Sequence, residues 1–145
     1  MIRVIVVEPH KEAYTMLVDE NTDFINELVG ENAKRIRPYD DPVAIVYNPD
    51  YKRIKMPRCR ALTKLVEKNI EGNTIEEERI VDFFFGRFLI IQEDENKKPT
   101  KFDSVLCRAY KALFLYPESF RKDHGSWRIC EYHQEIPERK KTIAV

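Results

Sequence analysis

Residues 53–62, "RIKMPRCRAL", bring four basic side chains and one thiol into ten positions of the sequence. Neighbouring cations would lower the pKa of Cys59 and favour a reactive thiolate. A nucleophilic cysteine also needs a base, which would have to be His10, His124 or His133, and nothing in the spacing selects one of them. An incidental loop cysteine explains Cys59 more simply, so we favour a protein without a catalytic thiol and assign no catalytic residue.

Metal and nucleotide chemistry find little support in the residue spacing. A zinc set would combine Cys107, His124, Cys130 and His133, but the gaps of 16, 5 and 2 residues do not match paired knuckles. The four glycines are scattered, which excludes a Walker loop and a dinucleotide fingerprint. We therefore predict no metal and no cofactor.

Charge is distributed in blocks although the formal net charge is zero. Residues 1–33 carry two bases and seven acids, residues 34–60 eight and three, residues 61–100 six and nine, and residues 101–145 nine and six. Such alternation suggests acidic and basic faces that bind charged macromolecules, or segments that pair with one another in the fold.

Two surfaces could therefore contact a partner. The candidate residues are Arg53, Lys55, Arg58, Arg60, Glu67, Glu71, Glu76, Glu77 and Glu78. The basic ones belong to a stretch in which tyrosines are interleaved, as on nucleic-acid surfaces; this stretch holds Lys34, Arg35, Arg37, Lys52, Arg53, Lys55, Arg58 and Arg60, with Tyr39, Tyr47 and Tyr51. The glutamates are also typical of the solvated face of a helix.

The hydrophobic pattern predicts one α+β domain over residues 1–133. It would hold a curved mixed or antiparallel sheet of five or more strands with two or three packed helices. We expect a short helix after Asn21 or Thr22, a longer one from about Thr100 to Tyr116, and a flexible tail at 134–145. Strands are predicted at 2–7, 13–18, 43–47 and 51–56, in "FFFGRFLIIQ" and in "SWRICEYH".

Residues 63–82 are expected to form a helical insertion that protrudes from this domain. Leu62, Leu65, Val66 and Ile70 would make its apolar stripe. Thr74 and Glu77 have the spacing of a capping box.

Composition limits the location of the protein. The apolar runs are far shorter than the roughly twenty residues that span a bilayer. The strand-like pattern at residue 2 leaves no room for a signal peptide, and three unpaired cysteines suit a reducing compartment. We expect a cytoplasmic protein that does not enter membranes.

Six motifs together resemble one uncharacterised family. They are "MIRVIVVEPHKEAY", "ELVG", "IRPYDDPVAIVYN", "PRCRAL", "GRFLII" and "LFLYPESF". The family consists of small proteins of bacteriophages, plasmids and conjugative elements and is known as a domain of unknown function. The likeness covers about 1–62 and 83–120, so 63–82 looks like an enlargement; His10 and Cys59 replace the usual glycine and asparagine.

The resemblance implies an accessory protein of a mobile element in a bacterial host. Small proteins of this kind often inhibit host defence by binding its effectors. The leading hypothesis is thus a non-enzymatic inhibitor of a host macromolecule such as a defence nuclease, of the anti-CRISPR or antirestriction type. The alternative is a protein that binds or processes nucleic acid through the basic surface at 34–60. The sequence leaves the partner and the oligomeric state open.

Overall fold

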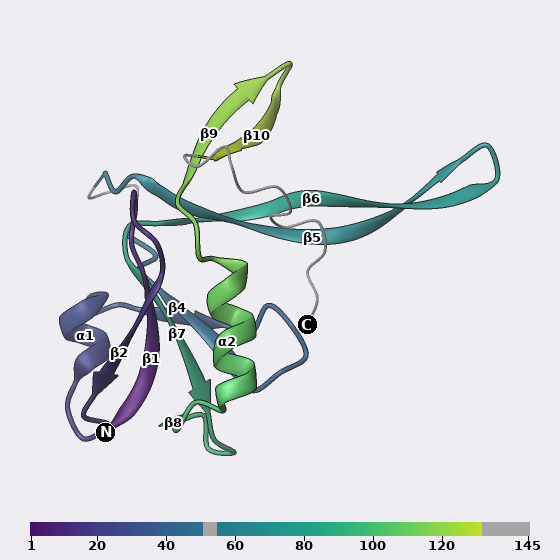
Figure 1. Cartoon of the computed structure of the whole chain (residues 1–145). Coiled ribbons are helices and arrows are strands. Elements are labelled where there is room, and N and C mark those ends of the chain that lie inside the picture. Colours follow the sequence, from purple (N-terminus) through teal and green to yellow (C-terminus); the bar gives the residue numbers. More distant parts are fainter. Residues whose placement is uncertain (51–54, 132–145) are drawn as a thin grey trace.

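A computed structural model describes residues 1–50 and 55–131 of the chain. In this part of the chain a six-stranded antiparallel sheet has the order β2-β1-β7-β4-β3, and β8 pairs with the end of β7 (Figure 1). The strands of this sheet are β1 (Ile2–Val7), β2 (Tyr14–Val18), β3 (Lys34–Ile36), β4 (Val43–Tyr47), β7 (Phe88–Glu93) and β8 (Pro99–Thr100).

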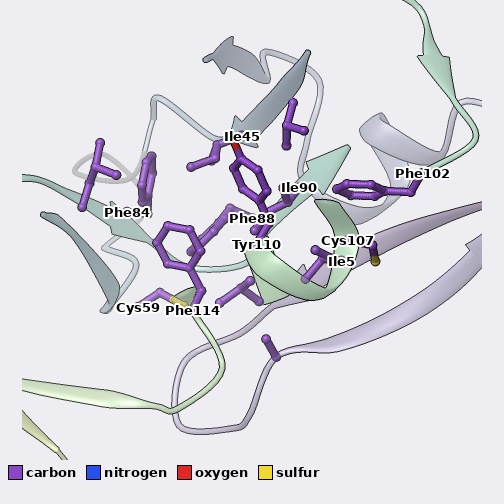
Figure 2. Close-up of a cluster of buried hydrophobic side chains, with 14 residues drawn as sticks. Ile5, Ile45, Cys59, Phe84, Phe88, Ile90, Phe102, Cys107, Tyr110 and Phe114 are labelled. Atoms are coloured by element: carbon purple, nitrogen blue, oxygen red, sulfur yellow. The ribbon is translucent and has the colours of Figure 1, made fainter. Parts of the chain in front are cut away.

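The three central strands of the main sheet, β1, β7 and β4, are apolar on both faces because other parts of the chain pack against both faces. Against one face, α2 (Ser104–Leu113) packs with the phenylalanine-rich cluster that Figure 2 shows, which includes Phe84, Phe88 and Phe114. The opposite face buries Phe24 of α1 (Phe24–Leu28) against Val4, Val6, Leu89 and other aliphatic side chains. Burial on both sides explains why β1, β4 and β7 have nearly continuous apolar sequences.

The helices are shorter than the sequence predicts. The carboxylate of Asp103 accepts hydrogen bonds at 3.1 Å from the N–H groups of Val105 and Leu106, so it caps α2. Helix α2 begins at Ser104 rather than Thr100 because Pro99 and Thr100 pair with β7.

The prediction of a helical insertion at 63–82 is wrong. Residues of this segment lie in two 13-residue strands, β5 (Arg58–Ile70) and β6 (Asn73–Phe85), which form a separate two-stranded sheet. Glu71 and Gly72 join them with φ of 52° and 80°, the conformation that a two-residue hairpin turn needs. Thr74 lies opposite Asn69 across the ladder instead of capping a helix.

This β5–β6 hairpin extends away from the main sheet (Figure 1). A second hairpin, β9 (Glu118–Asp123) with β10 (Ser126–Glu131), rises beside its base. Gly86 ends β6: its φ is 65°, and a Cβ there would lie 2.5 Å from the Met56 sulfur, so the predicted "FFFGRFLIIQ" strand is divided at this close approach.

The α+β prediction is confirmed in outline. The described residues hold two helices, and the main sheet has six strands where five or more were expected. The "SWRICEYH" prediction agrees with β10 where the chain is described. Most of the strand predicted at 51–56 and the predicted tail at 134–145 lie outside the described residues.

Candidate partner-binding surface

Arg60 holds three parts of the chain together and is completely buried. Its guanidinium donates to the carbonyl oxygens of Lys11 at 2.6 Å, Phe114 at 2.9 Å, Cys59 at 3.0 Å and Glu8 at 3.3 Å. Arg60 was expected to be a partner-binding candidate, and that prediction is wrong because the side chain has no exposed surface. It braces the β1–β2 turn and the end of α2.

Glu8 lies beside Arg60 and binds a second arginine. Its carboxylate accepts hydrogen bonds from Arg87 at 2.6 and 2.9 Å, from Tyr14 at 3.0 Å and from Lys11 at 3.1 Å. Burial acts to raise the pKa of Glu8, but the hydrogen bonds from Arg87, Lys11 and Tyr14 bring it below its ordinary value. We call the set Glu8, Cys59, Arg60, Arg87 and Glu118 the Arg60 junction.

The remaining members of the Arg60 junction also serve the fold. Glu118 is 3% exposed, and its carboxylate accepts the Ala61 N–H at 2.9 Å. Cys59 is completely buried, and this burial raises the pKa of its thiol to about 12, which the nearby Arg60 charge only partly offsets. Cys59 is therefore a protonated thiol at neutral pH and not a nucleophile.

The candidate zinc ligands do not meet in the described part of the chain. Cys107 is buried on α2, whereas His124 lies in the turn between β9 and β10, and His133 is outside the described residues. Among residues 1–50 and 55–131 no three histidine, cysteine, aspartate or glutamate side chains are grouped to hold a metal ion.

The described arginines of the basic stretch at 34–60 each have a partner within the fold. Arg35 and Arg37 bind the buried carboxylate of Glu93 at 2.8 and 3.0 Å. The Arg58 guanidinium lies 4.2 Å from the ring centroid of Trp127 and 5.2 Å from that of Phe83. Arg60 is buried, whereas Arg35, Arg37 and Arg58 are exposed beside these partners.

The glutamates of the β5–β6 hairpin are divided between its two faces. Glu67 lies directly opposite Glu76, and Glu78, paired with Leu65, is two residues further along the same face. We call Glu67, Glu76 and Glu78 the acidic face. Like charges opposed across strands destabilise a ladder. The arrangement therefore costs the hairpin stability rather than supporting it.

The opposite face of the hairpin has a different character. Glu77 lies there, 3.3 Å from Arg79 and 4.0 Å from Lys68, so its charge is compensated within the hairpin. Glu71 is in the turn at the tip. Of the basic candidates, Lys55 is exposed in the turn before β5, and Arg53 lies outside the described residues.

An open groove of about 1000 Å³ lies between the two hairpins. It is bordered by seven consecutive residues of β6, 77–83, by Thr63 of β5, and by residues 126–129 of β10. Side chains of successive strand residues point to opposite faces of a sheet. Seven consecutive residues of β6 can therefore border one groove only if the groove runs along the edge of this strand. We call this feature the hairpin groove.

Aromatic contacts lie at the Phe83 end of the hairpin groove. The Phe83 ring lies 5.1 Å from that of Phe120 and 5.6 Å from that of Trp127, both nearly perpendicular to it. These rings and Arg58 join β6 to the β9–β10 hairpin. Trp127 was not among the candidate residues predicted from the sequence, although it is the single tryptophan of a chain with strand patterning.

A family model described as "Domain of unknown function (DUF3846)" matches residues 2–115. The chain belongs to this family, which agrees with the uncharacterised class expected from its motifs. The matched region includes the whole β5–β6 hairpin. Neither the curated proteins nor the solved structures gave a match to this chain.

The helices of the described residues are too short or too polar to cross a bilayer.

Proposed function

We propose that this protein is a non-enzymatic binding protein that uses the β5–β6 hairpin to engage and inhibit a host macromolecule. The observation that carries the proposal is the acidic face. Three carboxylates, Glu67, Glu76 and Glu78, follow one face of a hairpin that extends away from the main sheet. Opposing Glu67 and Glu76 lowers the stability of the free hairpin, and a cationic surface of a partner would relieve this repulsion in a complex.

The proposed class of partner is a nucleic-acid-binding protein of host defence, such as a nuclease. Carboxylates on a strand can stand where phosphates would lie and occupy a channel lined by arginine and lysine. The protein would then be an accessory protein of a phage or mobile element that acts in the bacterial cytoplasm. Stoichiometric occlusion of this kind requires no catalytic group.

The experiment mixes the purified chain with purified CRISPR effector nucleases and restriction endonucleases on a sizing column. A variant with E67K, E76K and E78K reverses the acidic face. A matched control with E12K, E27K and E31K changes the net charge equally at exposed positions away from the hairpin.

We expect a complex with at least one nuclease that survives in the control and is lost in the reversed hairpin. Target DNA or RNA should compete with the protein for that nuclease. Equal binding by both variants would contradict the role of the acidic face, and no complex with any nuclease would count against the partner class.

A further inference from the structure

Among residues 1–50 and 55–131, nothing pairs with the edge of β6 that borders the hairpin groove. Within the described residues β6 pairs only with β5, so alternate residues of β6 direct their N–H and C=O groups away from β5. Residues 77–83 of this strand border the hairpin groove, a length of about 20 Å at the usual rise of a strand. An unpaired edge at a groove of this length is the geometry used when an extended peptide adds to a sheet.

The charges at this edge select the kind of segment that could add. Glu76, Glu77 and Glu78 are consecutive on β6. A second copy of the same edge would bring these carboxylates together across a new ladder, which is unfavourable. Nucleic acid would be repelled for the same reason. A strand with lysine or arginine at alternate positions would instead place its cations beside Glu76 and Glu78.

The wall of the groove suits the same occupant. Glu78 accepts a hydrogen bond from the Thr63 hydroxyl at 2.6 Å, and Asp82, four residues further along β6, is exposed. The two arginines that border the groove have carboxylate neighbours in the fold: Arg79 at 3.3 Å from Glu77, and Arg128 at 3.5 Å from Asp123. Trp127 and Ile129 add apolar surface on the β10 side, against which the alternate side chains of a strand could pack.

We propose that the hairpin groove binds an extended cationic segment of a partner protein, which adds as a third strand to the open edge of β6. The inference rests on the proposed binding role of the hairpin and adds the chemistry of what is bound. The bound segment has about six or seven residues, with a basic side chain at every second position facing the acidic face.

The test uses a synthetic ten-residue peptide of alternating lysine with threonine or valine. Trp127 is the single tryptophan of the chain and borders the groove, so its fluorescence reports occupancy by a peptide that has none. Two further peptides carry the same charges but are N-methylated at either the odd or the even residues. N-methylation removes the hydrogen bonds that a strand makes on one side.

We expect saturable binding of the parent peptide and at least tenfold weaker binding for one or both N-methylated peptides. The E76Q and E78Q double variant should also bind at least tenfold more weakly, whereas E12Q and E27Q should bind as the unmodified chain does. Hydrogen exchange should slow at alternate amides of β6 within 73–83 when the peptide is bound.

Several results would overturn the inference. Equal binding of all three peptides would show electrostatic adsorption without strand pairing. Binding of single-stranded DNA at Trp127, or a peptide-sensitive dimer of the protein, would identify a different occupant. Absence of peptide binding while a nuclease complex survives would refute strand addition and leave the proposed function standing; peptide binding without any nuclease complex would refute only the proposed partner class.

Discussion

The Arg60 junction and the β5–β6 hairpin both contain several charged side chains, but the charges are held by hydrogen bonds at the junction and repel one another on the acidic face of the hairpin. At the junction, Arg60 and Glu118 are buried and make hydrogen bonds to the backbone, and Glu8 is bound by Arg87. On the hairpin, Glu67 and Glu76 oppose each other at exposed positions. Burying a charge without partners is costly, whereas exposed repulsion costs little and leaves the charge available. The first arrangement serves folding and the second favours binding.

The largest effect in this comparison is expected from Arg60. Arg60→Ala would leave buried carbonyl groups unsatisfied, so the free energy of unfolding should fall by about 3 kcal/mol or more. Arg60→Lys should recover only part of this loss, since one ammonium group cannot reach the carbonyls of Glu8, Lys11 and Phe114 together. Urea denaturation measures both, and a loss below about 1 kcal/mol would contradict the bracing role.

The reactivity of the Cys59 thiol reports how well the Arg60 junction is buried. Because burial raises its pKa to about 12, the thiol is protonated at pH 8 and is reached by reagents mainly through opening of the fold. Alkylation by iodoacetamide, followed by mass spectrometry, should be at least about a hundredfold slower at Cys59 than at the partly exposed Cys130. Similar rates at both sites would mean that the junction opens readily.

Glu8 should give the Arg60 junction a dependence on acid. Because the pKa of Glu8 is lowered in the fold, its carboxylate is protonated at a higher pH in the unfolded chain than in the folded protein. Its stabilisation is therefore present above about pH 4.5 and is lost as the pH falls through the value in the fold. Glu8→Gln should cost about 1–2 kcal/mol at pH 7 and less at pH 3, as measured by urea midpoints. An equal cost at both pH values would contradict this contribution.

The smallest effects should come from the hairpin, and they should differ in sign. Glu67→Gln removes the repulsion with Glu76 and should stabilise the hairpin by a few tenths of a kcal/mol at low salt. Glu77→Gln removes a carboxylate compensated by Arg79 and should destabilise it by a similar amount. Hydrogen exchange of the β5 and β6 amides measures both changes. The same sign for both would contradict the assignment of these residues to different faces.

The sequence predicted the buried strands best because their burial on both faces produces long apolar runs, as in β1 and β4. It failed at residues 63–82 because an exposed hairpin has no such run, and the many glutamates and lysines also suit a helix. The β-branched Val66, Ile70, Thr74 and Ile75 around the Glu71-Gly72 turn were the signal for strands. Arg60 was misjudged because an arginine in a basic stretch looks exposed until its carbonyl partners, which are distant in sequence, are known.

The hairpin groove could not be predicted from sequence at all. It depends on how β10 lies beside β6, and this is set by the contacts of Phe83 with Phe120 and Trp127. Residues 37 and 44 positions apart in the chain meet there only through the fold. The glutamates were predicted as candidate partner-binding residues from the sequence. Their division between the two faces of the hairpin became clear only from the register of the β5–β6 ladder.

The role of the hairpin can be tested most directly by shortening it. Thr63 and Ile80 face each other across the ladder, so an Asn-Gly turn can replace residues 64–79 without altering the strands below. Thermal unfolding first verifies that the rest of the protein is folded. Calorimetric titration then measures the affinity for the nuclease that forms a complex with the protein on the sizing column. We predict at least a hundredfold loss of affinity with the rest of the protein intact. Unchanged affinity in the folded, shortened chain would contradict the claim that the β5–β6 hairpin is the binding element.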